Sequence, residues 1–198
     1  MNIHELTQKI IDTIPAEQRF SADDAALVAQ HKDYLLGLEN ELVQGFYDAI
    51  ERSPQMAALI SHGSRSEREM VLRRWWQRTL QGPFDGQYWA WQTLVGVVHI
   101  KAGVENPMMM GMWQWIMTWL RSRIGSEAPG GAATAAQLMA SLERLALMTQ
   151  TITAESYLRN YLETVVRLTG FKPALLDRMF KAEIDTVLRE ARQQLGSV

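Results

Sequence analysis

The chain has 198 residues, a formal net charge of −2 and no cysteine. A chain of this length typically forms one domain and buries about 70% of its unfolded surface without needing a disulfide or a metal. The lack of cysteine excludes disulfides, thiolate zinc sites, iron–sulfur clusters, C-x-x-C-H haem attachment and a cysteine nucleophile. It fits a reducing compartment, so we expect a cytoplasmic protein. The nearly balanced charge gives no reason to expect nucleic acid as a partner.

The sequence predicts no membrane insertion. The N-terminal segment carries Glu5, Lys9 and Asp12, whereas a signal peptide would have an apolar core there. No stretch reaches the roughly 18 uncharged apolar residues that a transmembrane helix needs.

Almost every segment is predicted to be helical. A first helix over residues 3–14 ends at Pro15. A second is predicted over residues 21–38, with Ser21 as a favourable N-cap and Asp23 and Asp24 in its first turn. Apolar spacing and Gly or Pro boundaries predict further helices over 38–52, 54–60, 64–82, 86–102 and 106–124.

The end of the chain is predicted to hold one loop and two more helices. For the helix over 106–124, Asn106 is the expected cap and Pro107 lies in the first turn. Residues 125–134, rich in glycine and alanine, predict a loop, and a long helical run then ends at Gly170. A last helix over 171–195 has one apolar face. The fold class is therefore all-α, with about eight or nine helices.

One histidine stands alone on an apolar face. His99 shares its helical face with Trp91, Gln92 and Val95. Spacing alone favours a core histidine with a satisfied ring. Zinc needs three or four protein ligands, and no second ligand stands at a suitable spacing. Haem supplies four nitrogen ligands and needs a single histidine, so haem is the metal cofactor that this residue could hold.

The other three histidines lie in polar or terminal segments. We expect His4, His31 and His62 to be solvated.

Three segments together resemble a known group of proteins. The first is H-x-x-x-G-V-x-x-P, from His99 to Pro107, followed by an apolar helix rich in Met and Trp. The second is residues 42–60, with the pair Phe46-Tyr47 and a proline seven residues after the tyrosine. The third is VLRRWWQRTLQG, residues 71–82. Their order and rough spacing, over about residues 20–165, resemble the globin-coupled sensor and protoglobin families.

The resemblance implies a globin-like fold with an extra helix at each end. The expected parts are an N-terminal extension helix over 1–19, a sensor-globin domain over 20–169 and a C-terminal helical extension over 170–198.

The resemblance also implies a cofactor, haem b (iron protoporphyrin IX), with His99 as the proximal iron ligand. Tyr47 would be the distal residue, whose hydroxyl donates a hydrogen bond to the bound gas. An alternative for Tyr47 is a core aromatic whose hydroxyl reaches a backbone carbonyl. The further cofactor contacts that we expect are Phe46, Leu72, Trp91, Val95 and Val104.

Several details of the pocket stay open at this point. The ligand-facing residue of the distal helix is Arg68, Glu69 or Leu72. We expect the side chains from Met108 to Met110 to pack adaptably in the core rather than to supply a second axial ligand to the iron. Of the seven tryptophans, we expect two or three at the cofactor.

The function implied is that of a single-domain gas sensor rather than an enzyme. It would bind dioxygen, nitric oxide or carbon monoxide at pentacoordinate iron and signal in trans. Signalling would run through a protein partner or through a homodimer, formed by the last two globin helices over 113–119 and 138–158. The roughly 28 residues after Gly170 are too few for a catalytic output domain.

Two other functions compete with the sensor. One is a haem-dependent redox enzyme, such as a nitric oxide dioxygenase or a peroxidase, for which no distal histidine–arginine pair is evident. The other is a haem-free interaction module, which would leave His99 and Tyr47 without a purpose. The helix over 171–195 could pack on the globin, complete a dimer or dock a partner.

Overall fold

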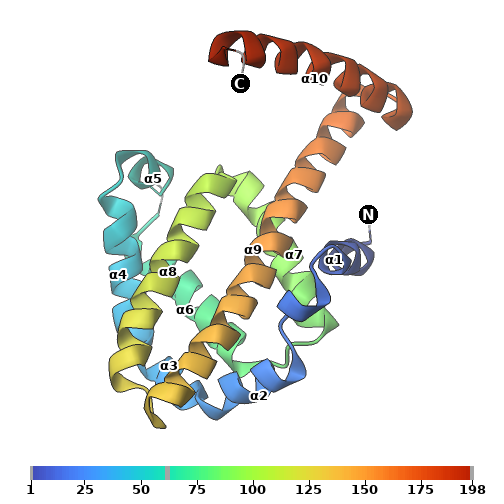
Figure 1. The fold of residues 1–198 in the computed structure, drawn as a ribbon. Helices are drawn as coiled ribbons and strands as arrows, with labels where there is room; N and C mark the ends of the chain where they lie inside the picture. Colours follow the sequence, from blue (N-terminus) through green and yellow to red (C-terminus); the bar gives the residue numbers. More distant parts are fainter. Residues whose placement is uncertain (1, 61–62, 197–198) are drawn as a thin grey trace. The chain divides into compact units, whose positions relative to one another are not determined.

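The computed structural model describes residues 2–60 and 63–196. His62 therefore lies outside the described residues. The described residues contain no strand, and the predicted all-α class is confirmed (Figure 1). The helices in chain order are α1 (Ile3–Asp12), the short 3-10 helix η1 (Ala16–Gln18), α2 (Ala22–Gln30), α3 (Lys32–Gly37), α4 (Glu39–Glu51), α5 (Pro54–Leu59), α6 (Arg65–Gln81), α7 (Gly86–Ala102), α8 (Asn106–Glu127), α9 (Gly131–Thr169) and α10 (Pro173–Leu195).

The chain divides into two compact units. Unit 1 spans residues 1–157 and unit 2 spans residues 158–198. Unit 1 contains α1 to α8 and most of α9, while unit 2 contains the last turns of α9 and all of α10. The predicted domain boundaries at residues 19 and 169 stay a prediction.

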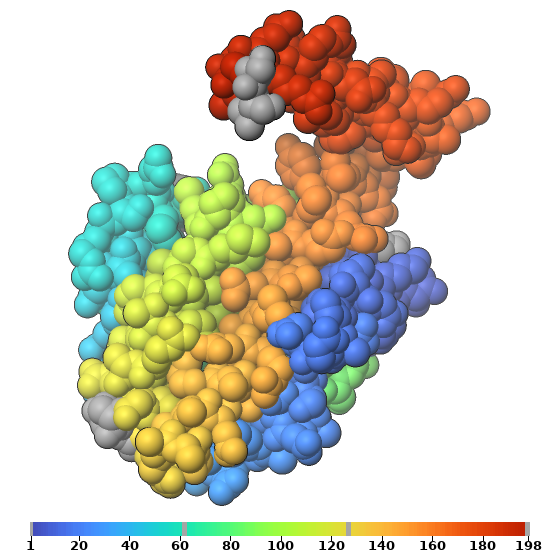
Figure 2. Space-filling view, viewed as in Figure 1, coloured from blue at the N-terminus to red at the C-terminus, as the bar shows by residue number. Residues whose placement is uncertain are grey.

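Unit 1 is built around one apolar core. Within it α1 packs against α7, and α4 packs against both α6 and α8. Helices α8 and α9 share the face seen in Figure 2, joined by the Arg121–Glu143 ion pair. The fully buried side chains at the centre include Ile10, Leu35, Leu42, Leu80, Leu120, Leu138 and Ile152. Because these side chains come from six helices, the core depends on contacts far apart in sequence.

Helices α7 and α9 approach each other unusually closely. A Cβ built on Gly96 would lie 2.5 Å from the carbonyl oxygen of Thr153 and 2.9 Å from the Cβ of Ser156. The Ser156 hydroxyl donates to the carbonyl of Thr93 at 2.7 Å, which fixes the crossing. Only glycine fits at this position, and the crossing brings α9 against the helix that carries His99.

The predicted helix starts at Ser21 and Ser64 are confirmed as N-caps with capping boxes. The predicted cap of α8 is wrong, because Asn106 is already helical and its side chain donates to the carbonyl of Ala154 on α9. The predicted loop over 125–134 is also too long. Helix α8 continues to Glu127 and α9 begins at Gly131, since alanine and threonine tolerate a helix and only a short connection is needed.

The predicted helix after Ser21 is broken at His31. This residue separates α2 from α3, and its side chain is 6% exposed, which corrects the expectation that it is solvated. The ring nitrogen Nδ1 lies 3.0 Å from the carbonyl oxygen of Leu27 in the preceding turn. The ring therefore has a hydrogen-bond partner inside the protein and does not need water. His4, by contrast, is exposed as predicted.

Among the described residues, no helix is long and apolar enough to cross a membrane.

Candidate functional site

Local sequence signals set the start and the end of α7, the helix that carries His99. The Asp85 carboxylate accepts hydrogen bonds from the N–H groups of Gln87 and Tyr88, both at 2.9 Å. At the other end Gly103 has φ +70°, and the N–H of Val104 donates to the carbonyl of His99 at 3.0 Å. The glycine thus reverses the chain one turn after the histidine and brings Val104 back beside it.

His99 lines a large cavity inside unit 1. The cavity has a volume of about 600 Å³, within the range of about 300–1,000 Å³ typical of cofactor and ligand sites. Its walls come from α4 to α9 and are mostly apolar. The lining residues are Phe46, Tyr47, Ile50, Met56, Leu59, Ile60, Val71, Leu72, Arg74, Trp75, Arg78, Trp91, Gln92, Val95, Val98, His99, Val104, Met108, Met109, Met112, Trp113, Ile116, Thr149 and Thr153.

The cavity reaches the surface between α6 and α7. Val71, Arg74 and Arg78 on α6 line the cavity and are exposed. Val98 on α7 lines it as well and is also exposed. Exposed residues that line a cavity mark its mouth, so a ligand can enter here without unfolding the core.

The imidazole of His99 is free to bind a ligand. Its Nδ1 atom is buried and has no hydrogen-bond partner among the described residues. Burial lowers the pKa of the ring below its usual range, so the ring is neutral at pH 7 and keeps a nitrogen lone pair. A buried polar atom without a partner costs free energy, and a ligand in the cavity would offset that cost. Neutral imidazole is also a common ligand for iron.

Tyr47 lies on another wall of the cavity, but its hydroxyl is already engaged. The side chain is 7% exposed, and its hydroxyl donates to the carbonyl of Arg68 at 2.8 Å. Burial raises the pKa of Tyr47 to about 12, so the hydroxyl keeps its proton at neutral pH. A phenol has one proton to donate. Tyr47 can therefore serve a second acceptor in the cavity only by rotating away from Arg68.

Of the three candidates on the distal helix, only Leu72 lines the cavity. Glu69 accepts a hydrogen bond from Arg65 at 2.8 Å, and Arg68 donates from Nη1 to the carbonyl of Gly63 at 2.8 Å. The distal wall contributed by α6 is therefore apolar at this position.

One buried polar group in the wall has no counterpart in the sequence-based prediction of the site. Gln92 is fully buried, and its amide Nε2 donates to the hydroxyl of Tyr88 at 2.9 Å. Its Oε1 atom has no hydrogen-bond partner among the described residues. Gln92 lies seven residues before His99, so both are on the same side of α7. This part of the cavity wall can accept a hydrogen bond from a bound molecule.

The cavity contains every residue predicted from the sequence to contact the cofactor. The structure brings His99, Tyr47, Phe46, Leu72, Trp91, Val95 and Val104 together on its walls.

Sequence reasoning missed the wall contributed by α8. Met108, Met109, Met112, Trp113 and Ile116 all line the cavity, whereas Met110 points outward and is exposed. Their spacing of three and four residues is the pattern of one helical face, and this signal was available in the sequence. Three tryptophans line the cavity, and they are Trp75, Trp91 and Trp113. The number of tryptophans that contact a cofactor stays a prediction.

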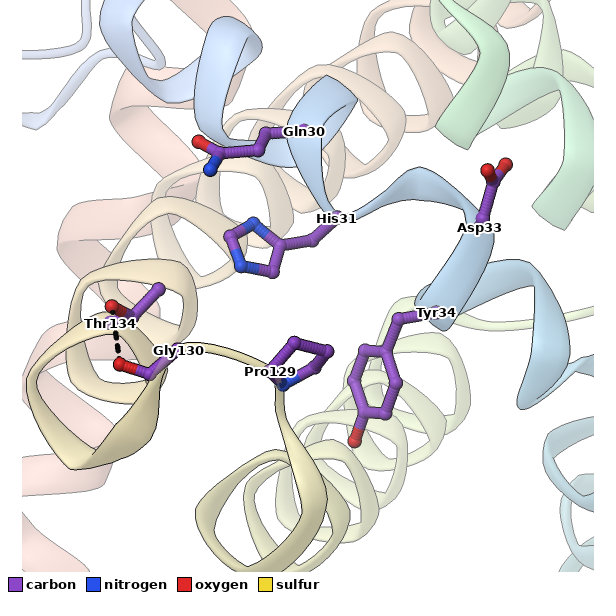
Figure 3. Close-up of a pocket in the computed structure, with 7 residues that line it drawn as sticks. All are labelled: Gln30, His31, Asp33, Tyr34, Pro129, Gly130 and Thr134. Atoms are coloured by element: carbon purple, nitrogen blue, oxygen red, sulfur yellow. Dashed lines mark hydrogen bonds between the residues drawn. The ribbon is translucent and has the colours of Figure 1, made fainter.

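A second cavity, of about 410 Å³, lies between α2, α3 and the start of α9 (Figure 3). Figure 3 shows the ring of His31 facing Thr134 and Gly130, with Pro129 and Tyr34 on another side. The hydroxyl of Thr134 already donates a hydrogen bond of 3.0 Å to the carbonyl of Gly130. None of the residues predicted to bind a cofactor lines this cavity, so the cavity at His99 is the candidate functional site.

Comparison with protein families gives one match that covers most of the chain. The Protoglobin family model matches residues 16–163. The chain belongs to the protoglobin family. The matched range begins within η1, includes every residue that lines the cavity at His99, and ends inside α9. The predicted family is thereby confirmed.

A solved structure confirms the globin fold of this protoglobin. The globin domain of the Geobacter sulfurreducens globin-coupled sensor is similar, with a TM-score of 0.67 and 20% sequence identity. The similar region covers 76% of this protoglobin and 96% of that chain. A comparison with curated proteins found no significant match.

Proposed function

We propose that this protoglobin binds haem b through His99 and senses a diatomic gas. The observation that carries the proposal is the neutral imidazole of His99, which lines a large apolar cavity and has no hydrogen-bond partner at Nδ1 among the described residues. When bound, haem supplies an iron atom that can take dioxygen, nitric oxide or carbon monoxide.

The residues around the cavity fit a flat, mostly apolar cofactor. Trp91 and Val95 lie on the same helix as His99, and Phe46 and Leu72 belong to other walls. Apolar walls exclude water and favour a gas molecule over a charged ligand. Tyr47 supplies a protonated hydroxyl that can reorient toward a polarised ligand, which would favour dioxygen over carbon monoxide.

The signalling step belongs to the same proposal. Gas binding would shift the equilibrium between two arrangements of the helices, and a second copy or a protein partner would respond to the shift. Unit 2 supports it, because α10 exposes Phe180, Ile184 and Val187 on one face. Exposed apolar faces of this kind often mark interaction sites.

The test of haem binding is absorption spectroscopy of the purified chain after addition of hemin, with and without carbon monoxide. We expect a Soret band that shifts with carbon monoxide. His99→Ala should lose this spectrum, and added imidazole should restore it in that variant. His31→Gln is the matched control, since it removes another buried imidazole that does not line the cavity. A wild-type spectrum in His99→Ala would contradict the assignment of the ligand.

A further inference from the structure

Helix α6 carries five arginines, and two of them stand apart from the others. Arg65 pairs with Asp48, Glu51 and Glu69, and Arg73 pairs with Glu39 at 3.1 Å. Arg74 and Arg78, by contrast, have no carboxylate within ion-pair distance among the described residues, although the chain has more acidic than basic residues. Of the residues that the structure describes, these two are also the only charged ones that line the cavity at His99.

Arg78 has no hydrogen-bond or ion-pair partner among the described residues. The guanidinium carbon lies 4.0 Å from the centre of the Trp91 ring, so the cation rests on the aromatic face. This contact uses no N–H···O hydrogen bond, so the N–H donors of the guanidinium remain for an anionic acceptor. Trp91 itself lines the cavity. Arg78 is thus held at the mouth with its donors available.

Arg74 lies one helical turn before Arg78, so both side chains project from the same face of α6. Its one polar contact in the described residues is a 3.4 Å approach of Nη2 to the sulfur of Met70, a weak acceptor. Two like charges four residues apart disfavour a helix slightly. An anion held between them would remove that repulsion and satisfy both side chains.

We infer that Arg74 and Arg78 bind the carboxylate groups of the tetrapyrrole that occupies the cavity; the inference rests on the proposed function. A dicarboxylic porphyrin has an apolar body and two anionic arms on one edge. The cavity matches this division, since its walls are mostly apolar and its two arginines stand together at the exposed mouth. The two arginines therefore orient the porphyrin, with its carboxylates toward solvent between α6 and α7.

The test compares acids with esters. The apoprotein is titrated with metal-free protoporphyrin IX and with its dimethyl ester, and tryptophan quenching gives each Kd. We expect the wild type to prefer the acid, and Arg74→Gln with Arg78→Gln together to lose about tenfold in affinity for the acid and little for the ester. Arg73→Gln is the matched control on the same helix, because Arg73 pairs with Glu39 and does not line the cavity. Circular dichroism melting checks that each variant folds.

The outcomes separate this inference from the proposed function. Equal affinity of the wild type for acid and ester, or an equal loss of both in the double variant, would overturn the carboxylate site even if hemin binds through His99. The metal-free porphyrin has no iron, so the preference for its acid form does not depend on His99. If His99→Ala bound hemin normally, only the assignment of His99 as the iron ligand would be overturned. Failure of every porphyrin to bind would overturn both. Displacement of the porphyrin by an equal concentration of oleate would assign the cavity to a fatty acid instead.

Discussion

At the residue scale, Tyr47 has one proton and two possible acceptors. In the structure the hydroxyl donates a hydrogen bond of 2.8 Å to the carbonyl of Arg68, which links α4 to α6. Bound dioxygen carries partial negative charge and can compete for that proton, whereas carbon monoxide is less polarised. In the proposed function, Tyr47 would therefore couple a bound gas to the contact between α4 and α6.

The substitution Tyr47→Phe removes the hydroxyl and keeps the aromatic ring. We expect dioxygen to dissociate from the haem-loaded variant up to about tenfold faster, the value of one hydrogen bond, and carbon monoxide to dissociate at a nearly unchanged rate. Stopped-flow measurement of both rates checks this. Tyr88→Phe is the control, since it removes another buried hydroxyl outside the cavity. Equal effects on the two gases would mean that Tyr47 serves only the bond to Arg68.

The sequence placed the individual site residues but not their partners. His99, Gly103 and Pro107 form a local motif, and the apolar spacing on α7 assigns Trp91 and Val95 to the face of His99. The acceptor for Tyr47 lies 21 residues away on another helix, and nothing in the local sequence indicates it. Likewise, the orientation of α6 about its axis decides that Leu72 faces the cavity and Arg68 and Glu69 do not. That orientation is set by packing against other helices, which the local sequence does not show.

At the element scale, the crossing of α7 and α9 forms the support behind His99. Gly96→Ala places a methyl group 2.5 Å from a backbone carbonyl, which cannot move as a flexible side chain would. We therefore expect the free energy of unfolding to fall by about 1–3 kcal/mol, the usual cost of overpacking. Urea denaturation of the apoprotein measures this, and hemin affinity should fall in parallel because α7 shifts.

Gly111→Ala on α8 is the matched control. An added Cβ there meets no atom within 4 Å, and the position is exposed. Alanine should stabilise this helix by about 0.5–1 kcal/mol through its lower entropy in the unfolded chain. If both substitutions had the same sign, the close approach of α7 and α9 would not be what requires glycine at position 96.

A second link between elements joins α2 to α9 through Asp24. Its carboxylate accepts from Arg144, from the hydroxyl of Ser141 at 2.7 Å and from the N–H of Ser21 at 2.8 Å. Burial alone would raise its pKa, but the hydrogen bond from Arg144 and those from Ser21 and Ser141 together hold the pKa well below its usual range. The folded state thus favours the ionised carboxylate.

The pH dependence follows from that direction. The unfolded chain takes up this proton near pH 4, above the pKa in the folded state, so the stabilisation is complete above pH 4 and is lost as the pH falls further. We expect Asp24→Asn to unfold about 1–3 kcal/mol more easily at pH 7 and the difference from wild type to shrink below pH 4. Chemical denaturation at several pH values measures it, with the exposed neighbour variant Asp23→Asn as control. A constant difference at every pH would contradict the role of the charge.

The helix boundaries show which signals are local. The starts at Ser21 and Ser64 were predictable because a capping box is complete within four residues. The break at His31 was not, since the ring is buried by contacts with other parts of unit 1. The hydrogen bond from the Asn106 side chain to the carbonyl of Ala154 joins residues 48 positions apart in the sequence. It explains why the asparagine does not cap its own helix.

At the scale of the whole molecule, the candidate site belongs to unit 1 alone. Every residue that lines the cavity falls between Phe46 and Thr153, and unit 1 extends to residue 157. The exposed apolar residues of α10 lie in unit 2. The candidate cofactor site and the exposed apolar residues of α10 therefore belong to separate units, and the helix α9 runs through both.

We expect removal of residues 171–198 to leave hemin affinity within about twofold of wild type, because every residue that lines the cavity belongs to unit 1 and is retained. It should also leave the urea midpoint of unit 1 unchanged, since none of its core side chains is removed. Hemin titration and denaturation of the shortened chain, beside the full chain with Phe180→Ser, check both. Normal binding in the substituted chain with a large loss in the shortened one would mean that the backbone of unit 2 supports the site. Unchanged binding in both would leave α10 available for the signalling partner.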